Sequence, residues 1–232
     1  MAQEFNPPFR VDLSDCGALV TGAGDEVGRA AALALAASGA AVVVNDVNPD
    51  RADKTADAIT ASGGRAIAWQ ADVSNRFQVA SMIEGGRDAF GKLNILVNAA
   101  SVLKRDPLGT LDEWDWRRIL DVNLTGAFFC TQLLSRVMAD EGGGVIVNVA
   151  SSAATLPNGL SYVSSKAGLI GLTRQSASEL APRGIRVNAV CPGLIDSDDT
   201  ADQVASVILF LCSGAARLIN GQAIHVGDGS AE

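Results

Sequence analysis

Residues 17–46 read GALVTGAGDEVGRAAALALAASGAAVVVND, and this stretch decides the fold. A short apolar run at Gly17–Thr21 leads through a glycine-rich turn into an alanine-rich segment, and a second apolar run follows at Ala40–Asp46. A strand, turn, helix and strand in this order is the unit from which parallel sheets are built. Glycines at the turn let the backbone approach a pyrophosphate, whose charge is favoured by the free N–H groups at the start of the helix. The stretch therefore predicts a dinucleotide site.

Short apolar runs alternate with longer amphipathic segments along the rest of the chain, a pattern typical of a parallel sheet covered by helices. The expected strands are Gly17–Thr21, Ala40–Asp46, Arg65–Gln70, Leu93–Asn98, Gly144–Ala150, Ile185–Val190 and Gln222–Val226. The expected helices are Gly28–Ser38, Pro49–Ser62, Arg76–Phe90, Leu111–Ala139, Tyr162–Ala181 and Asp202–Cys212. We expect an α/β fold: a single doubly wound Rossmann-type domain at residues 11–232, with a seven-stranded parallel sheet and helices on both faces, after an N-terminal tail at residues 1–10.

The composition argues against several classes of function. Of the 232 residues, 48% are hydrophobic and 19% are charged, which is enough for a sizeable core, and a net charge of −8 without a basic cluster argues against nucleic acid as a partner. The longest apolar run, Ala30–Ala37, has 8 residues, far below the ~20 that cross a bilayer, so no membrane partner is expected. The 4 cysteines lack metal-ligand spacing and the 1 histidine is His225, so we expect free thiols, a cytoplasmic location and no metal site.

The end of the second apolar run carries a residue that distinguishes between two cofactors. Asp46 stands eighteen residues after Gly28. A carboxylate at this place accepts hydrogen bonds from both ribose hydroxyls of NAD and repels the 2′-phosphate of NADP. The sequence therefore favours NAD over NADP.

A reaction centre is predicted from a tyrosine and a lysine on one helix. Tyr162, the only tyrosine of the chain, and Lys166 are four residues apart, so they lie one turn apart on the same face. A nearby cation favours the phenolate and lowers the tyrosine pKa, which lets the phenol give or take a proton at an alcohol or carbonyl oxygen. After the fifth strand come Ser151 and Ser152, and a serine hydroxyl there is placed to polarise the same substrate oxygen.

These motifs resemble those of the short-chain dehydrogenase/reductase family, in particular its 3-oxoacyl reductase-like and NAD-dependent alcohol dehydrogenase members. Thr21, Gly22 and Gly28 match the family's opening motif, Thr-Gly-x-x-x-Gly-x-Gly. Together with the reasoning above, the resemblance implies that the cofactor is contacted by Gly22, Gly24, Val27, Gly28, Asp46, Asp72, Val73, Asn98, Tyr162, Lys166, Pro192, Gly193 and Ile195. It also implies that Asn98 helps to stabilise the sheet.

The resemblance completes a catalytic set of four residues. Tyr162 is the implied general acid/base, and Lys166 lowers its pKa and binds the nicotinamide ribose. Ser151, which stands third after Asn148 as in the family, is favoured over Ser152 to hold the substrate oxygen. Asn123 holds a water that links Lys166 to solvent. The implied reaction is hydride transfer between NAD(H) and a secondary alcohol or ketone, with a small molecule as the partner.

Three positions depart from the family's motifs. Glu26 stands where the family usually has its middle glycine, and a carboxylate beside a pyrophosphate is unfavourable unless it turns to solvent or meets Arg29. Ala99 and Ser101 replace an asparagine and a glycine after the fourth strand. Two alternatives stay open: an NADPH-dependent 3-oxoacyl thioester reductase, and a cofactor-binding or scaffold protein that kept the fold and lost turnover.

The segment between Gly193 and Ala201 is only seven residues long, 194–200, where the family usually has a long helical substrate lid. Either the active site is open, with weak catalysis or a bulky substrate, or residues are missing from the sequence at this place. The family commonly assembles through its long helices and last strand. We therefore expect a homotetramer or a homodimer through Leu111–Ala139 and Tyr162–Ala181.

Overall fold

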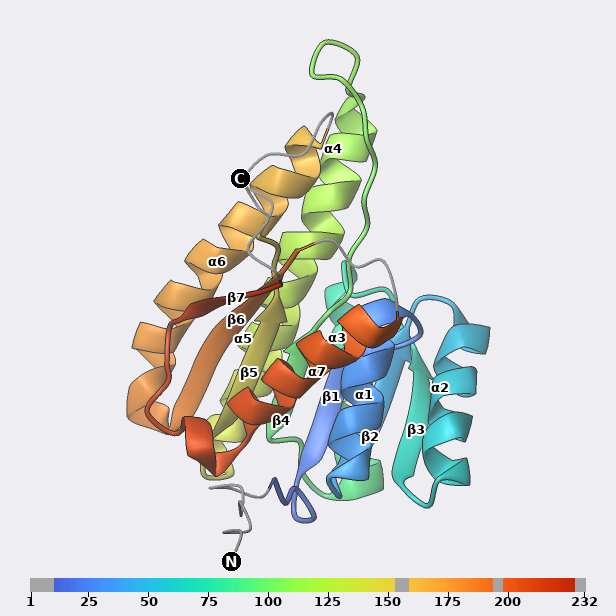
Figure 1. The fold of residues 1–232 in the computed structure, drawn as a ribbon, viewed down its shortest axis with the longest axis vertical. Coiled ribbons are helices and arrows are strands. Elements are labelled where there is room, and N and C mark those ends of the chain that lie inside the picture. The colour runs from blue at the N-terminus through green and yellow to red at the C-terminus, as the bar shows by residue number, and fades with distance from the viewer. Residues whose placement is uncertain (1–10, 153–158, 194–197, 228–232) are drawn as a thin grey trace, which may run out of the picture.

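The computed structural model describes residues 11–152, 159–193 and 198–227, which form a parallel sheet with helices on both faces (Figure 1). The strands are β1 (Gly17–Thr21), β2 (Ala41–Asp46), β3 (Arg65–Gln70), β4 (Ile95–Asn98), β5 (Gly144–Val149), β6 (Ile185–Pro192) and β7 (Ala223–Val226). Their order is β3-β2-β1-β4-β5-β6-β7, and every neighbouring pair is parallel. The expected doubly wound α/β fold is confirmed.

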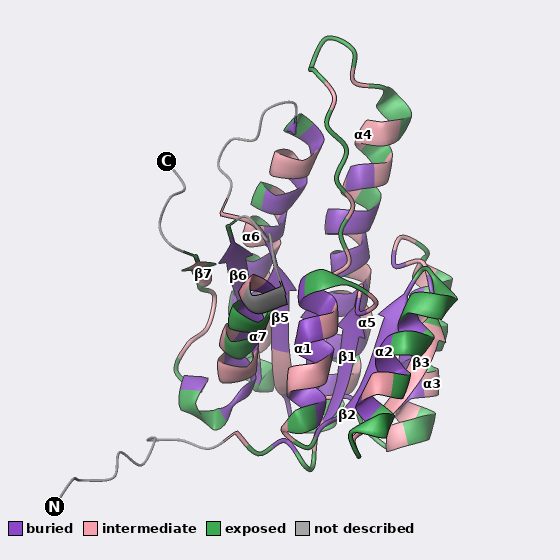
Figure 2. Ribbon diagram, turned by 45° about the vertical axis from the view of Figure 1, so that its right-hand side comes forward, coloured by how far each residue is buried: buried purple, intermediate pink, exposed green. Residues whose placement is uncertain are grey.

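Helices cover both faces of this sheet. They are α1 (Glu26–Ala37), α2 (Pro49–Ala61), α3 (Arg76–Phe90), α4 (Glu113–Leu120), α5 (Ala127–Asp140), α6 (Leu160–Leu180) and α7 (Asp198–Cys212). Helices α1, α2 and α7 pack on one face, and α3, α5 and α6 pack on the other. Figure 2 shows that the inner strands β1, β2, β4, β5 and β6 are mostly buried between these layers, whereas the edge strand β3 is only partly buried.

The alternation of side chains along β2 explains why its apolar run is continuous. Val42 and Val44 belong to the core cluster beneath α1 and α7, whereas Val43 belongs to the cluster beneath α3 and α5. Successive side chains of a strand point to opposite faces, so a strand covered on both faces needs apolar residues at every position. The same argument applies to β1, all five residues of which are buried.

The topology reverses at β1, which pairs with β2 on one side and with β4 on the other. The chain winds outward from this strand in both directions, and open α/β sheets bind ligands at the carboxyl ends of the strands beside such a switch point. The loops after β1, β2, β4, β5 and β6 therefore meet at one edge of the sheet.

The structure corrects the expected helix over Leu111–Ala139. It is interrupted, because a π-helical turn at Asp121–Gly126 joins α4 to α5. Asp112 accepts a hydrogen bond from the Trp114 amide at 2.7 Å and caps α4, so the helix begins at Glu113 rather than at Leu111. The prediction of one uninterrupted helix was wrong because the π-helical turn depends on tertiary contacts. The apolar periodicity of the sequence does not reveal such contacts.

The ends of several other helices and strands differ by a few residues from those expected from the sequence. Helices α1, α6 and α7 begin before the expected positions, and β6 continues to Pro192 instead of ending at Val190. At α1, the Asp25 carboxylate accepts a hydrogen bond from the Glu26 amide at 3.0 Å and caps the helix. The helix therefore begins at Glu26, two residues before the expected start at Gly28. Strand β6 is extended by its pairing with β7, where Pro192 stands opposite Val226.

The described residues contain no helix that is long and apolar enough to cross a membrane. All four cysteines are free thiols, as expected. Burial raises the pKa of Cys130 and of Cys212 to about 12, which keeps these two thiols protonated at neutral pH.

Candidate active site

A cleft of about 470 Å³ opens where the strands end at the switch point. Its walls come from the loop after β1, the end of β2, the segments after β3 and β4, the end of β5 and the end of β6. Most of the predicted site residues line it: Gly22, Val27, Gly28, Asp46, Asp72, Val73, Ser151, Tyr162, Lys166, Pro192 and Gly193. Distant parts of the sequence thus meet in one cleft.

The glycines of the first turn are required by close backbone contacts. Gly22 has a φ of 63°, and a Cβ added there would lie 2.6 Å from the Ala100 Cα. A Cβ at Gly28 would lie 2.1 Å from the Gly22 carbonyl oxygen. A Cβ at Gly24 would lie 2.6 Å from a carboxylate oxygen of Asp46, although Gly24 itself does not line the cleft. This turn and the N-terminus of α1 form a cradle of the kind that holds a pyrophosphate, so the residues fit a dinucleotide.

Asp46 ends β2 with its carboxylate held toward this turn. The side chain is 7% exposed, and its two oxygens accept hydrogen bonds from the Gly24 amide at 3.2 Å and the Asn48 amide at 2.9 Å. The guanidinium of Arg51, a residue that also lines the cleft, forms an ion pair with Asp25 at 3.1 Å. Asp46 is thus fixed by backbone amides and keeps its negative charge toward the cleft, as ribose recognition requires.

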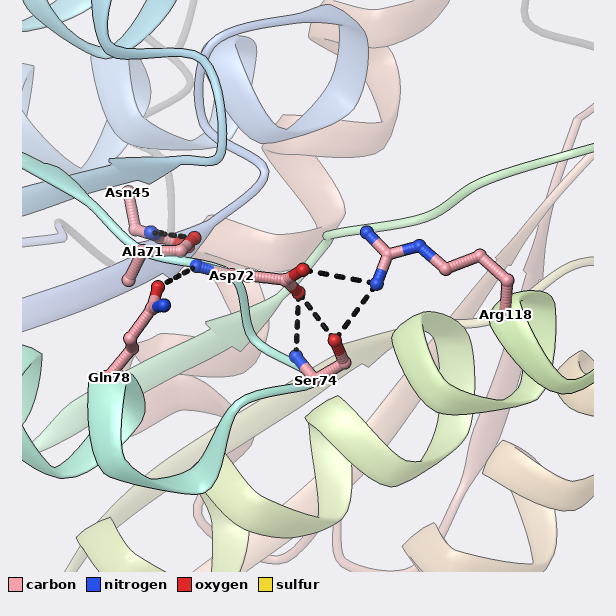
Figure 3. Close-up of polar contacts among 6 residues, drawn as sticks. All are labelled: Asn45, Ala71, Asp72, Ser74, Gln78 and Arg118. Carbon is pink, nitrogen blue, oxygen red and sulfur yellow. Dashed lines mark hydrogen bonds and ion pairs between the residues drawn. The ribbon is translucent and has the colours of Figure 1, made fainter.

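Figure 3 shows a polar cluster around Asp72 in the segment that follows β3. Its carboxylate accepts hydrogen bonds from the Ser74 hydroxyl at 2.7 Å and the Ser74 amide at 2.9 Å, and from the Arg118 guanidinium at 3.0 Å. Burial opposes ionisation of Asp72, but the Ser74 hydrogen bonds and the Arg118 charge outweigh it and hold its pKa below the usual value. Arg118 lies on α4, 46 positions away, and the sequence motifs did not identify it.

Tyr162 stands near the start of α6 and lines the cleft together with Ser151 and Ser101. Burial is the main cause that raises the pKa of Tyr162, and the charge of Glu26 raises it further. The hydroxyls of Ser151 and Ser101 lower it, but burial prevails. The expected lowering of the tyrosine pKa by Lys166 is therefore wrong for this structure, because the spacing of the two residues does not reveal how deeply the phenol is buried.

Lys166 lies one turn after Tyr162 on α6, as the spacing predicts. It is 3% exposed, its Nζ donates to the Val149 carbonyl oxygen at 2.8 Å, and Nζ lies 5.5 Å from the centre of the Tyr162 ring. Burial lowers the pKa of Lys166 to about 8, although the nearby Cys191 acts in the opposite direction. The ammonium therefore sits beside the ring of the tyrosine while being held by the end of β5.

This burial predicts that Lys166→Met stabilises the protein at neutral pH. The folded chain binds the proton of Lys166 with a pKa of about 8, against 10.5 for an ordinary lysine, so ionisation below pH 8 opposes folding. After allowing for the lost hydrogen bond to Val149, we expect a gain of about 2 kcal/mol at pH 7. Wild-type stability rises between the two pKa values, so the gain shrinks from pH 8 and disappears above pH 10.5. Thermal unfolding of both proteins across this range checks the prediction, which a destabilised variant at pH 7 would contradict.

The two serines after β5 take different places. The Ser152 hydroxyl donates to the Pro192 carbonyl oxygen at 3.0 Å and ties β5 to β6. Ser151 lines the cleft, as Tyr162 does, and its hydroxyl lowers the pKa of Tyr162. The geometry thus supports Ser151 as the residue facing a substrate. Pro192 and Gly193 line the cleft nearby, while Ile195 lies outside the described residues.

The two predicted asparagines lie behind the cleft wall rather than in it. Asn98 is 3% exposed and its amide nitrogen donates to the Asn148 side chain at 2.8 Å, which links β4 to β5. Asn123, within the π-helical turn, donates to the Val102 carbonyl oxygen and to the Ser165 hydroxyl, both at 3.0 Å. In the structure both amides are therefore engaged in holding the wall of the site together.

Glu26 is the only non-glycine residue with a positive φ in the described part of the chain, at 41°. It is exposed, lines the cleft, and forms no ion pair with Arg29 within the described residues. Of the two arrangements considered for its carboxylate, the one that meets Arg29 is not observed. The backbone at this position therefore keeps the conformation that a glycine adopts most easily.

The comparisons with known proteins agree with this geometry. The family model described as short chain dehydrogenase matches residues 17–207. A 3-oxoacyl-[acyl-carrier-protein] reductase of Synechocystis sp. is 40% identical over 235 aligned positions, covering 91% of this chain and 95% of the relative. The (2S)-[(R)-hydroxy(phenyl)methyl]succinyl-CoA dehydrogenase subunit BbsD of Thauera aromatica is 36% identical, with coverage of 91% and 95%. A solved 7α-hydroxysteroid dehydrogenase complexed with NADH and 7-oxo glycochenodeoxycholic acid has a TM-score of 0.90 at 33% identity and covers 94% of this chain and 95% of its own. The chain belongs to the short-chain dehydrogenase family and is an NAD(P)-dependent oxidoreductase.

Proposed function

We propose that this enzyme interconverts a secondary alcohol and a ketone with NAD(H), and that Tyr162 is its general acid/base. The observation that carries the proposal is the meeting, in one cleft, of the glycine cradle with Asp46 and of Tyr162 with Ser151. The first pair is suited to an adenosine ribose and pyrophosphate, and the second to an oxygen that gains or loses a proton. The named activities of the three relatives all concern a hydroxyl or oxo carbon, which supports the same reaction class.

The roles of the residues follow from their positions. The glycine cradle and Asp46 bind the dinucleotide, with Asp72 and Val73 at its adenine, and when bound it accepts or supplies the hydride. The Ser151 hydroxyl donates a hydrogen bond to the substrate oxygen, and Tyr162 takes the proton of the alcohol or returns it to the ketone. Lys166 provides the positive charge beside the Tyr162 ring.

Asn123 and the Pro192–Gly193 segment complete the proposed site. The Asn123 amide holds the Val102 backbone and Ser165, and we propose that it orders the water path to Lys166. Pro192 and Gly193 flank the nicotinamide, together with Ile195. Asn98 supports the cofactor site from behind by fixing the end of β4.

The choice of NAD over NADP rests on Asp46, and a solved relative whose title names NADH supports it. The second candidate, an NADPH-dependent 3-oxoacyl thioester reductase, is favoured by the names of the Synechocystis and Thauera relatives, both of which concern an acyl thioester. The Arg51 guanidinium could meet a 2′-phosphate only by leaving Asp25. Cofactor preference therefore separates the two candidates.

We expect turnover with NADH to exceed turnover with NADPH by about 30-fold in kcat/KM, because Asp46 repels a 2′-phosphate. Asp46→Asn keeps the size of the side chain and removes its charge, so it is expected to abolish most of this preference. The assay measures reduction of a panel containing 3-oxoacyl thioesters, simple ketones and oxo-steroids. A wild-type enzyme that prefers NADPH would overturn the NAD assignment and support the thioester reductase.

Three further features belong to the proposal. We propose that the segment 194–200 is shorter than the substrate segment of related enzymes; residues 194–197 lie outside the described residues. In support, the alignment with the Synechocystis relative has 235 positions but covers only 91% of the 232 residues of this chain, so that relative has residues without a counterpart in this chain.

We also propose a cytoplasmic homotetramer or homodimer formed through α4, α5, α6 and β7. The exposed Phe128 on α5 and Leu160 on α6 support this assembly, which light scattering tests.

A further inference from the structure

The backbone around Asp72 is held by side chains of two neighbouring elements (Figure 3). From β2, the Asn45 side chain donates to the carbonyl oxygen of Ala71, the residue just before Asp72, at 3.1 Å. From α3, the Gln78 side chain accepts a hydrogen bond from the Asp72 amide at 2.7 Å. Asn45 is 1% exposed, so its amide is confined by the surrounding residues. The position of the Asp72 backbone is therefore fixed, and the torsions of its side chain decide where the carboxylate points.

The Asp72 carboxylate has an acceptor position left for a ligand. An ionised carboxylate accepts hydrogen bonds at about four lone-pair positions, shared equally by its oxygens, and it donates none. Oδ1 accepts from the Ser74 hydroxyl at 2.7 Å and from the Ser74 amide at 2.9 Å, whereas Oδ2 accepts from the Arg118 guanidinium at 3.0 Å. The described residues thus fill both positions of Oδ1 and one of the two positions of Oδ2. A ligand that reaches this carboxylate from the cleft must supply a donor.

Arg118 determines how the carboxylate is turned. The Nη1 atom that donates to Asp72 Oδ2 also donates to the Ser74 hydroxyl at 2.9 Å, and this hydroxyl donates in turn to Oδ1. The three side chains therefore form a closed ring of hydrogen bonds. Because a guanidinium is planar and its donors have fixed directions, such a ring restricts rotation of the carboxylate. Arg118 lines the cleft as Asp72 does, and the two side chains are 34% and 28% exposed.

We propose that Arg118 is a positioning residue for cofactor recognition, which turns the Asp72 carboxylate so that Oδ2 accepts a hydrogen bond from the amino group of the adenine ring. This inference rests on the proposed placement of adenine at Asp72 and Val73. It gives a task to a residue on α4, 46 positions away from Asp72. It also predicts a chemical preference: a base with an amino group at this place binds better than a base with a carbonyl oxygen there, since an ionised carboxylate has no proton to donate.

The charge of Arg118 by itself would act differently. Asp46, Asp72 and Glu26 all line the cleft, and their carboxylates repel the pyrophosphate of any dinucleotide. The positive charge of Arg118 reduces this repulsion whichever base the dinucleotide carries. A positioning role, in contrast, changes the preference between two bases. The ratio of two dissociation constants therefore separates the two roles.

The test compares NADH with its reduced hypoxanthine analogue, in which a carbonyl oxygen replaces the amino group of the base. Calorimetric titration measures the dissociation constants of both for wild type, Arg118→Met and Arg118→Lys. We expect wild type to bind NADH about tenfold more tightly than the analogue, and Arg118→Met to reduce this preference to about threefold or less. Arg118→Lys keeps the charge but loses the planar arrangement of donors, so it should restore the affinity for both dinucleotides more than the preference between them.

Two further variants serve as comparisons. Arg117→Met is the matched control, because Arg117 is the neighbouring arginine on α4, pairs with Glu113 at 2.7 Å and does not line the cleft. It should keep the wild-type preference. Asp72→Asn has a side chain that can donate as well as accept, so its preference should fall close to one. If Arg118 acts through Asp72, Arg118→Met added to Asp72→Asn should change the preference no further.

Arg118→Met that weakens the binding of both dinucleotides equally, with the preference unchanged, would overturn the proposal and leave Arg118 a role through charge alone. Equal binding of the two dinucleotides by wild type would overturn it as well. Thermal unfolding checks that each variant is folded, and Arg118→Lys carries the test if Arg118→Met does not fold. The titrations need no turnover. A preference that depends on Arg118, found in a protein that reduces no ketone, would therefore support the positioning role and refute the proposed reaction alone.

Discussion

Tyr162→Phe is expected to lower kcat/KM for alcohol oxidation by about 10³-fold. The change removes only the hydroxyl, which takes the proton in the proposed reaction. The ring stays, so the packing against the Lys166 ammonium, 5.5 Å from the ring centre, is preserved. Affinity for NADH is expected to change by less than about threefold, because the glycine cradle and Asp46 are untouched.

Two measurements separate this loss from a structural effect. NADH binding is followed by fluorescence titration, and thermal unfolding checks the fold. Ser164→Ala, on the same helix but outside the cleft, serves as the matched control and should keep wild-type kcat. Retention of near wild-type turnover by Tyr162→Phe would refute the assignment of the general acid/base. A loss of NADH binding of the same size would instead place Tyr162 in cofactor binding.

Most of the fold could be predicted from local patterns in the sequence. The apolar runs that became β1 and β2 are buried on both faces, so their sequence is distinctive without any tertiary information. The Tyr162–Lys166 spacing also depends only on helix geometry, and α6 places both residues in the cleft. The glycine turn was identifiable for a similar reason, because a tight turn before a helix constrains residue type locally.

What the sequence could not supply were contacts between elements far apart along the chain. The π-helical turn exists where Asn123 holds the Val102 backbone, 21 positions away, and no period within the segment reports that contact. The pair of Asp72 and Arg118 spans 46 positions. Each of these depends on where β4 and α4 lie relative to the cleft, which only the tertiary structure fixes.

Glu26→Gly is expected to raise NADH affinity by about tenfold and the free energy of unfolding by about 1 kcal/mol. The stability gain follows from the φ of 41° at Glu26, since a side chain in this region costs energy that glycine does not pay. The affinity gain follows from the position of the carboxylate in the wall of the cleft, where it repels the negative charge of a pyrophosphate. Calorimetric titration with NADH and thermal unfolding measure the two effects.

Glu26→Gln separates charge from backbone strain. The glutamine keeps the length of the side chain and the strained φ, so it should recover most of the affinity gain and none of the stability gain. Added salt screens the repulsion, so the affinity advantage of both variants should shrink as ionic strength rises. Equal NADH affinity in wild type and Glu26→Gln at low salt would show that the carboxylate turns away from the bound cofactor.

The same two variants bear on the phenol. Because the charge of Glu26 raises the pKa of Tyr162, both Glu26→Gln and Glu26→Gly should let the phenol ionise at lower pH. Tyr162 is the only tyrosine of the chain, so the ultraviolet absorbance of the phenolate measures this change directly. An unchanged absorbance titration in both variants would show that the carboxylate does not act on the phenol.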